Sequence, residues 1–234
     1  MNTENVDAAE IEKFSALASR WWDTQSEFKT LHDINPLRVD YIDKQSGGLE
    51  GKKVLDIGCG GGILSEAMAA RDADVTGIDM AEQSLDVAKM HLHESGLSVD
   101  YHLITAEQFA EQHENQFDVV CCLEMLEHVP DPASIINAAA KTLKPDGTLV
   151  LSTLNRNAKS YMLAIVGAEY IMKMLPKGTH DYQKFLKPSE LAQAARSASL
   201  EVTDITGLSY NPLSKNYSLG QDVDVNYLMT CHNL

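Results

Sequence analysis

A hydrophobic run that ends in a cluster of glycines constrains this chain more than any other feature. Residues 54–64 read Val-Leu-Asp-Ile-Gly-Cys-Gly-Gly-Gly-Ile-Leu, and about one βα unit later residues 75–79 read Val-Thr-Gly-Ile-Asp. A strand that leads through a glycine turn into a helix, followed by a second strand that ends in an acid, is typical of a parallel sheet that binds a nucleoside. Asp79 would then accept hydrogen bonds from two ribose hydroxyls. The pattern therefore predicts a ligand with an unmodified ribose.

The spacing of the glycines separates two classes of nucleoside ligand. A dinucleotide site has the pattern G-x-G-x-x-G, and counting from Gly58 and Gly60 its third glycine would fall on Ile63. The string is instead G-x-G-x-G. It also follows Asp56, whose negative charge would repel a pyrophosphate but suits the ammonium of a methionine moiety. These residues favour S-adenosylmethionine over NAD, whereas a structural turn with incidental glycines leaves both acids unexplained.

The composition limits the kinds of binding partner and the cellular compartment that we expect for this protein. The 234 residues carry a formal charge of −15, which disfavours binding to the phosphates of a nucleic acid. No run reaches the roughly 18 to 20 apolar residues of a membrane span, and the acidic start of the chain lacks the features of a secretion signal. We therefore expect a cytoplasmic protein. The cysteines lack metal-ligand spacing and predict buried thiols in a reducing compartment: Cys59, Cys121, Cys122 and Cys231.

Hydrophobic segments alternate with helical patterns along most of the chain. Strands are expected at residues 53–57, 74–78, 99–104, 117–123, 148–153, 200–205 and 225–232. Helices are expected at residues 8–22, from Asn35-Pro36 through residue 42, and at 63–70, 83–95, 132–143 and 188–199. This alternation implies right-handed crossovers and a doubly wound α/β sheet.

A second group of polar residues follows the strand expected at 117–123. Leu123 precedes Glu124, Glu127 and His128, which would share one face if Glu124 began a helical turn. Two carboxylates and an imidazole there could hold one divalent cation, Mg or Mn from the oxygen ligands, with Zn also admitted by the histidine. In the alternative interpretation, an acid caps a helix and the histidine orients a loop, without metal.

Several strings resemble known methyltransferases. The string D-x-G-x-G-x-G resembles motif I of the class I methyltransferases. Narrower strings are similar to the ubiquinone biosynthesis O-methyltransferases of bacteria and mitochondria over nearly the whole chain; among them are Trp21-Trp22-Asp23, Asn35-Pro-Leu-Arg38, Ser152-Thr-Leu-Asn-Arg-Asn157, Pro176-Lys-Gly-Thr-His-Asp181 and Val223-Asp-Val-Asn-Tyr227. One departure is Asp146, where related chains often have glycine; aspartate is also a good turn residue.

The resemblance implies a fold and a division of the chain. The fold would be the Rossmann-like class I methyltransferase fold, with a mainly parallel seven-stranded sheet, an antiparallel last strand and a helical lid insertion. All 234 residues would form one domain. Its parts would be an N-terminal helical cap (1–50), the cofactor-binding half (51–154), the insertion (155–187) and a C-terminal helix with strands (188–234).

The resemblance also implies a reaction and a set of site residues. Methyl would pass from S-adenosylmethionine to a phenolic hydroxyl of polyprenyl catechols and of 3-demethylubiquinol. Matched positions would bind the cofactor through Arg38 (methionine carboxylate), Gly58, Asp79 (ribose) and Leu123 (adenosine), beside Asp56 and Gly60 of the glycine string. Glu124, Glu127 and His128 would hold a divalent metal, expected to be Mg, that helps to form the phenolate. Without a metal, His128 or Glu124 would have to act as a general base.

A further expectation concerns the insertion at residues 155–187. Residues 161–176 are apolar but interrupted by Glu169 and Lys173, so the segment could lie on a membrane without crossing it. Residues 155–187 hold six basic and two acidic side chains, a local charge of +4. Such a segment suits anionic lipid at the inner membrane, where a polyprenyl substrate and other proteins of the pathway would reside. The alternative is a lid helix packed on the core with its lysines in water.

Other functions remain open from the sequence. A methyltransferase for another small aromatic molecule would share motif I without needing the narrow strings. A protein that binds the nucleoside without turnover would retain the same glycines and acids. An oxidoreductase is disfavoured by Ile63.

Overall fold

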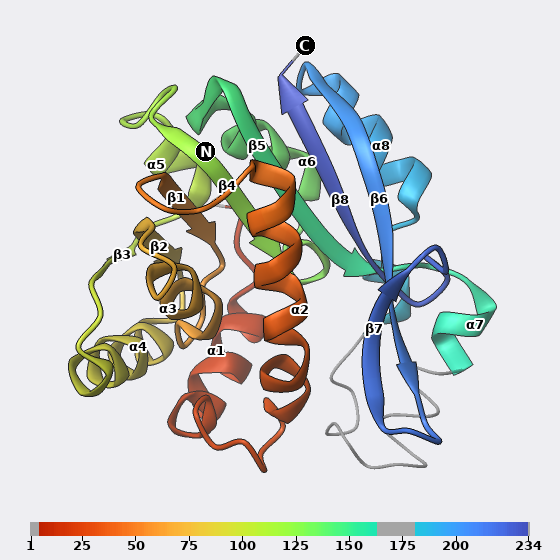
Figure 1. The fold of residues 1–234 in the computed structure, drawn as a ribbon, viewed down its shortest axis with the longest axis horizontal. Helices are drawn as coiled ribbons and strands as arrows, with labels where there is room; N and C mark the ends of the chain where they lie inside the picture. Colours follow the sequence, from red (N-terminus) through yellow and green to blue (C-terminus); the bar gives the residue numbers. More distant parts are fainter. Residues whose placement is uncertain (1–4, 163–180, 234) are drawn as a thin grey trace.

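The structure is a computed structural model that describes residues 5–162 and 181–233, and these form a mixed α/β arrangement (Figure 1). Eight strands make one sheet in the order β3-β2-β1-β4-β5-β8-β6-β7. The strands are β1 (Lys53–Ile57), β2 (Asp74–Asp79), β3 (Val99–Leu103), β4 (Phe117–Leu123), β5 (Leu143–Leu154), β6 (Leu200–Asn211), β7 (Asn216–Gly220) and β8 (Asn226–Asn233). The first five pair in parallel, whereas β8 runs antiparallel to both β5 and β6.

Helices cover both faces of this sheet. The α-helices are α1 (Ala8–Leu17), α2 (Lys29–Ser46), α3 (Ile63–Ala69), α4 (Glu82–Ser95), α5 (Ala106–Ala110), α6 (Pro132–Thr142), α7 (Ala158–Ser160) and α8 (Pro188–Ser197). Short 3₁₀ turns are η1 (Ala18–Arg20), η2 (Leu126–His128) and η4 (Tyr182–Lys184). One core layer contains buried side chains of α2, α3 and α4, and the other those of α5, α6 and α8. The doubly wound sheet with an antiparallel last strand is therefore confirmed, but it has eight strands rather than the expected seven, because β7 is added at its edge.

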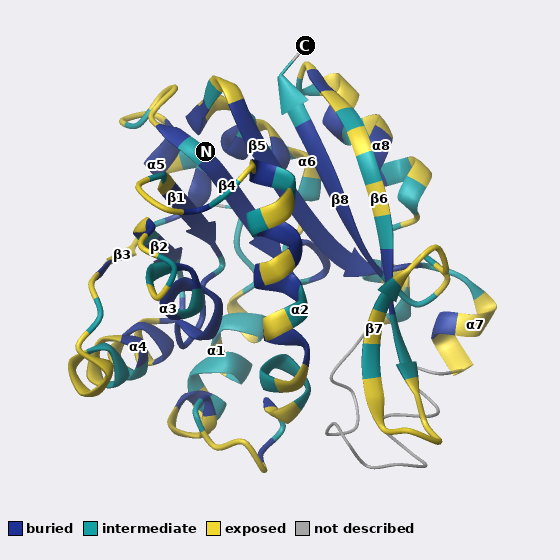
Figure 2. Cartoon of the chain, in the orientation of Figure 1, coloured by how far each residue is buried: buried dark blue, intermediate teal, exposed yellow. Residues whose placement is uncertain are grey.

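Strand β4 shows how the sequence specifies a central strand. Its alternate side chains enter different core layers: Val119 and Cys121 face α2 and α3, whereas Val120 and Cys122 face α6. All four are fully buried, as expected for a strand covered on both faces. Figure 2 shows the contrast with the β6–β7 hairpin, which is largely exposed or half-buried.

Several local features differ from the expectations, among them the helix expected at 8–22, which ends at Leu17. Helix α2 begins at Lys29 rather than at Asn35, and Pro36 lies inside it. The helix continues because its residues around the proline are held by tertiary contacts: Asn35 is buried and its Nδ2 donates to the backbone oxygen of Ile63 at 3.0 Å. Helix α5 and strand β7 were not expected. Strand β7 has five residues and no buried side chain, which leaves little hydrophobic signal.

No helix among the described residues is long and apolar enough to cross a membrane. Most of the lid expected at 155–187, including Glu169, Lys173, Lys177 and His180, lies outside the residues that the structure describes.

Candidate functional site

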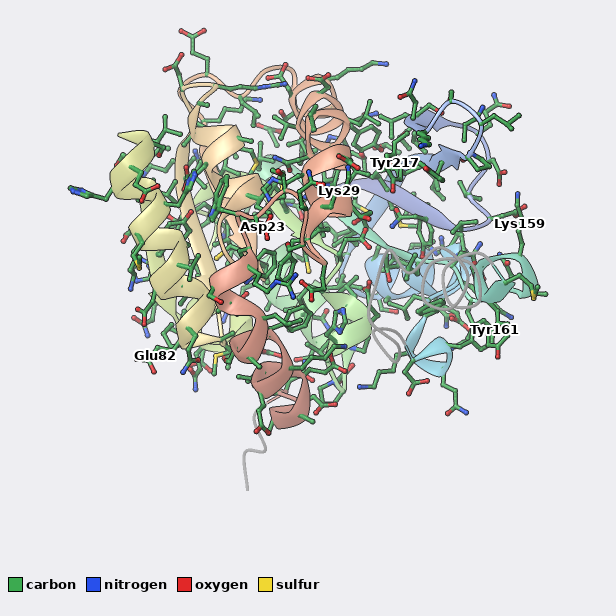
Figure 3. The ribbon with its side chains drawn as sticks, turned by 90° about the horizontal axis from the view of Figure 1, so that it is seen from below. Asp23, Lys29, Glu82, Lys159, Tyr161 and Tyr217 are labelled. Carbon is green, nitrogen blue, oxygen red and sulfur yellow. The ribbon has the colours of Figure 1, made fainter. Side chains whose placement is uncertain are left out.

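A cavity of about 1000 Å³ opens at the carboxyl ends of β1, β2 and β4. Its walls come from opposite parts of the chain: α1 and α2 contribute from the N-terminal side, and the β6–β7 hairpin contributes Tyr210 and Tyr217. Figure 3 looks toward this end of the sheet, with Lys29 of α2 beside Tyr217 of β7 and with Lys159 on α7. The cavity is lined by every residue predicted for the site: Arg38, Asp56, Gly58, Gly60, Asp79, Leu123, Glu124, Glu127 and His128.

The glycine turn after β1 is fixed by its neighbouring strand. The backbone N–H groups of Gly58 and Cys59 both donate to the carbonyl of Ile78, at 2.9 and 3.1 Å. Gly60 has φ +53°, and a Cβ there would come 2.6 Å from the ring of Trp21. The glycine is therefore required twice, for the left-handed backbone and for the close approach of an indole.

Asp79 lies at the tip of β2, where the sequence predicts a ribose-binding acid. Its Oδ2 accepts a hydrogen bond from the N–H of Gly60 at 2.8 Å, and its Oδ1 accepts one from the N–H of Ala81 at 2.7 Å. Burial raises the pKa of this carboxyl above its ordinary value, while the two backbone donors oppose the change. The acid is thus oriented by the loop it faces, with its carboxylate in the cavity wall.

Arg38 and Asp56 are both buried in the wall of the same cavity, and the charge of each influences the pKa of the other. Arg38 is only 4% exposed; its Nη2 donates to Oδ1 of Asn35 at 3.1 Å, and its Nε has no hydrogen-bond partner among the described residues. Asp56 accepts a hydrogen bond of 2.6 Å from the hydroxyl of Ser65, and burial raises its pKa to about 6. An orphaned guanidinium N–H in a cavity wall is suited to an anionic group such as a carboxylate.

Glu124 does not begin a helical turn. Its φ is +55°, a conformation that non-glycine residues rarely adopt, and the following 3₁₀ turn spans only Leu126–His128. Both carboxylate oxygens are engaged: Oε1 accepts from the hydroxyl of Ser152 at 2.6 Å, and Asn226 Nδ2 lies 3.0 and 3.1 Å from the two oxygens. The shared helical face predicted for Glu124, Glu127 and His128 is therefore not formed.

Glu127 is buried close to Glu124. Its Oε2 accepts a hydrogen bond of 2.8 Å from the hydroxyl of Thr153. Burial raises the pKa of Glu127 to about 7, and the negative charge of Glu124 acts in the same direction. The carboxyl of Glu127 is thus held partly in its neutral form near pH 7.

His128 pairs with a residue that the sequence did not indicate. Its Nδ1 lies 2.8 Å from Oε2 of Glu10 on α1, and the ring of Phe14 meets it edge to face at 5.1 Å between centroids. This pairing lowers the pKa of Glu10 to about 2. Within residues 5–162 and 181–233, no three or more His, Cys, Asp or Glu side chains are grouped so that they could hold a metal ion. The predicted Glu124–Glu127–His128 metal site is accordingly not supported.

The paired tryptophans close the N-terminal cap over the glycine turn. Trp21 Nε1 donates to the hydroxyl of Ser84 at 3.1 Å, and Trp22 Nε1 donates to the carbonyl of Gly61 at 2.9 Å. Trp21 lines the cavity, and His32 Nε2 lies 2.8 Å from the carbonyl of Trp21. The resemblance singled out both tryptophans, but no local pattern revealed their partners.

The sequence is similar to those of known methyltransferases. Residues 31–205 match a family model described as a methyltransferase domain. A ubiquinone biosynthesis O-methyltransferase of Pseudomonas aeruginosa is 66% identical over 225 residues, which cover 96% of this chain and 97% of that protein. The protein of the same name from Thiobacillus denitrificans is 64% identical over the same shares.

Solved structures agree with the fold. The magnesium protoporphyrin IX methyltransferase of Synechocystis, determined with bound S-adenosylmethionine, gives a TM-score of 0.66 at 17% identity and covers the whole of both chains. A methyltransferase from Thermotoga maritima, dependent on the same donor, gives 0.64 at 18% identity, covering 96% of this chain and 99% of its own. At this identity the likeness concerns the fold alone.

Proposed function

Because this chain belongs to the ubiquinone biosynthesis O-methyltransferase family, we propose that it methylates a phenolic hydroxyl of polyprenyl catechols and of 3-demethylubiquinol. Family membership makes it an O-methyltransferase of ubiquinone biosynthesis that uses S-adenosylmethionine. The choice of these two substrates is the proposal. A methyltransferase for another small aromatic molecule is the alternative, and the identity over nearly the whole chain argues against it.

The observation that carries the proposal is the cavity wall around the glycine turn. Asp79 lines this cavity with a carboxylate that suits a ribose, and the buried Nε–H of Arg38, which lacks a partner among the described residues, suits the methionine carboxylate of the cofactor. Leu123, at the end of β4, supplies an apolar surface for the adenosine region. The residues present therefore fit S-adenosylmethionine, which supplies an electrophilic methyl group when bound.

The apolar wall contributed by α1 suits the hydrophobic part of the substrate. Ile11, Phe14 and Leu17 line the same cavity as the cofactor residues, one or two helical turns apart. A polyprenyl chain is wholly apolar, so contact with these side chains would be driven by the hydrophobic effect. The cavity can thus hold a charged cofactor on the sheet side and a lipid-like substrate on the α1 side.

Methyl transfer requires an anionic oxygen aligned with the methyl group. A phenol with a pKa near 10 lies about three units above neutral pH, so forming the phenolate costs about 4 kcal/mol. Holding the two reactants in line can supply roughly 7 to 11 kcal/mol. The protein must therefore align the ring and also provide an acceptor for the phenolic proton.

A bound metal was expected to help remove the proton from the phenolic oxygen. The observed arrangement does not fit it, because no three acid, histidine or cysteine side chains of the described residues are grouped to hold an ion, and both oxygens of Glu124 are engaged by Ser152 and Asn226. We therefore assign no step to a metal, and the chelation arm of the experiment below tests that assignment.

The insertion is proposed to bring the enzyme to its lipid substrate. The apolar and basic character of residues 155–187 suits the anionic surface of the inner membrane, where other proteins of the pathway would be neighbours. Replacing Lys173 and Lys177 by Glu should weaken sedimentation with anionic vesicles, with neutral vesicles as the control. Unchanged sedimentation would count against this membrane role.

The decisive experiment is transfer of labelled methyl from S-adenosylmethionine to a short-prenyl catechol, with and without a chelator. Transfer to the catechol, at rates above those for a catechol without a prenyl group, is expected. Transfer that persists in the chelator supports a side-chain base. Loss on chelation with recovery in Mg would restore the metal assignment. Absence of transfer to any catechol would overturn the proposed function.

A further inference from the structure

The cavity has a second apolar wall, on the side of α2 and the β6–β7 hairpin. Its apolar lining residues are Leu31 and Ile34 of α2, Leu208 of β6, and Tyr210 and Tyr217 of the hairpin. Ile34 and Leu208 are buried in the same core cluster, and Leu31 and Tyr217 pack against that cluster. Hydrophobic packing therefore fixes the hairpin on α2, and this wall is part of the folded structure.

Two tyrosine rings lie together on the hairpin. Tyr210 of β6 and Tyr217 of β7 are paired directly across the two strands, and their ring centroids are 4.8 Å apart at an interplanar angle of 42°. Both side chains line the cavity and both residues are only half-buried, so part of each ring is left for a ligand. Figure 3 shows Tyr217 beside Lys29 at the start of α2. Aromatic rings offer a large apolar area with little rotational freedom, which suits contact with an apolar chain.

The two apolar walls differ in charge. Beside the apolar side chains of α1, the acids Asp7 and Glu10 also line the cavity, so an apolar chain that left along α1 would have to cover charged groups. The residues that the hairpin contributes to the lining are all uncharged: Leu208, Ser209, Tyr210, Pro212 and Tyr217. The residue after Pro212 is Leu213, which is 95% exposed at the turn. A path without charge therefore leads along the hairpin from the cavity to the surface.

The size of the cavity allows part of a lipid tail to be enclosed with the cofactor. A single drug-sized ligand occupies a pocket of roughly 300 to 1,000 Å³, and this cavity measures about 1000 Å³. The predicted cofactor residues follow β1, β2 and β4, whereas β7 lies at the edge of the sheet. Contact with the tail is thus separate from contact with the cofactor.

We propose that Tyr210 and Tyr217 determine substrate specificity, by holding the first isoprene units of the polyprenyl tail between the β6–β7 hairpin and α2. This inference rests on the proposed function. The contact is hydrophobic, because burial of the tail against the two rings removes apolar surface of both from water. The rings touch the tail rather than the reacting oxygen, so the contact is equally strong before and during methyl transfer. Its loss should therefore raise KM and leave kcat near the parent value.

The test measures kcat and KM for catechols that carry no tail or a tail of increasing length, up to a few isoprene units. In the parent, KM should fall as units are added. In Tyr210→Ala/Tyr217→Ala, KM for the longest tail should rise about tenfold or more, as expected when an aromatic side chain no longer buries its apolar area. KM for the catechol without a tail should stay near the parent value, because that substrate has nothing to place against the rings.

Two control variants separate the rings from other features of the hairpin. Tyr210→Phe/Tyr217→Phe keeps both rings and should match the parent on every catechol. Ser218→Ala changes an exposed residue of β7 that does not line the cavity, and it should also match the parent. Affinity for S-adenosylhomocysteine, measured by calorimetry, should be the same in all variants, which shows that each of them is folded.

The outcomes distinguish the role of the tyrosines from the proposed function. If the double alanine variant fails to fold, Tyr210→Ala alone, which leaves Tyr217 packed on α2, makes the same comparison with a smaller change. A KM that rises equally for catechols with and without a tail would overturn the role of the tyrosines. A dependence on tail length that is absent in the parent, or that survives the loss of the rings, would also overturn it. Failure of the parent to methylate any catechol would instead overturn the proposed function.

Discussion

The carboxylate of Asp79 accepts a hydrogen bond of 2.8 Å from the backbone N–H of Gly60, so the acid at the end of β2 and the glycine turn after β1 form one unit. A second hydrogen bond, from Ala81, fixes its other oxygen. Asp79 and the glycine turn therefore fix each other's orientation in the predicted nucleoside site.

Asp79→Ala should therefore lose nucleoside binding. Two hydrogen bonds to a charged group contribute about 3 kcal/mol or more, so affinity for S-adenosylhomocysteine should fall by about 100-fold or more. Titration calorimetry measures this. Asp74→Ala, an exposed acid at the opposite end of the same strand, is the matched control. Affinity retained in Asp79→Ala would refute the ribose assignment.

Arg38→Lys should weaken binding of the amino-acid part of the cofactor and leave binding of its nucleoside part unchanged. It keeps a positive charge near Asp56 and Glu124 but loses the forked N–H groups that suit a carboxylate. Affinity for S-adenosylhomocysteine should fall at least about tenfold. Affinity for methylthioadenosine, which lacks the amino-acid part, should stay near the parent value. Arg71→Lys, at an exposed ion pair with Asp40, serves as the control; equal losses for both ligands would contradict the assignment.

Gly61→Ala should destabilise the fold through Trp21. A Cβ on Gly61 would come 2.4 Å from Cγ of the indole, so the ring or the loop must shift at a cost of about 1 to 3 kcal/mol in the free energy of unfolding. Gly220→Ala meets no atom within 4 Å and should change little. Denaturant unfolding measures both. In the double variant with Trp21→Ala the two losses should be less than additive, because the contacts with Cγ and Cδ2 of the indole are removed while the contact with Cβ of residue 21 remains; full additivity would contradict the clash with the ring.

The stability of the protein should depend on Glu127 in a defined pH range. Its pKa is about 7 in the folded chain against 4.5 as its ordinary value, so the folded state binds more protons across that interval. Stability from this group is therefore present below the ordinary pKa and lost as the pH rises through about 7. Glu127→Gln should match the parent at pH 5 and exceed its free energy of unfolding by roughly 1 to 3 kcal/mol at pH 8.

Thermal or denaturant unfolding at the two pH values provides the measurement. Glu12→Gln, an exposed position, should give no pH-dependent difference. A Glu127→Gln difference that is the same at pH 5 and pH 8 would show that burial does not keep this carboxyl neutral.

The fold was predictable wherever hydrophobic patterning is strong. Strand β4 is a continuous apolar run, and the glycine turn and Asp79 are local strings whose place at the carboxyl ends of strands follows from the parallel sheet. Strand β7 was missed because its side chains are all exposed or half-buried. The start of α2 was misjudged because Pro36 usually marks a first helical turn, whereas here buried neighbours keep it inside the helix.

The site was predictable only in part. Residues that follow strands could be assigned to one end of the sheet, and the roles given to them remain predictions. The backbone of Glu124 could not be foreseen, because nothing in its residue type signals a positive φ. The partners Glu10 of His128 and Ser84 of Trp21 lie 118 and 63 residues away, and contacts over such separations leave no local pattern.

The contacts of the N-terminal cap have a consequence for how the chain folds. Asp7 of the cap pairs with Lys184, which is 177 residues later, and α1 has ten residues with none of them buried. A helix this short is marginal on its own in water. Helix α1 packs on α4 (Glu82–Ser95), whereas the Asp7–Lys184 ion pair needs the segment after the insertion, so this wall of the cavity is complete only when an early and a late part of the chain have come together.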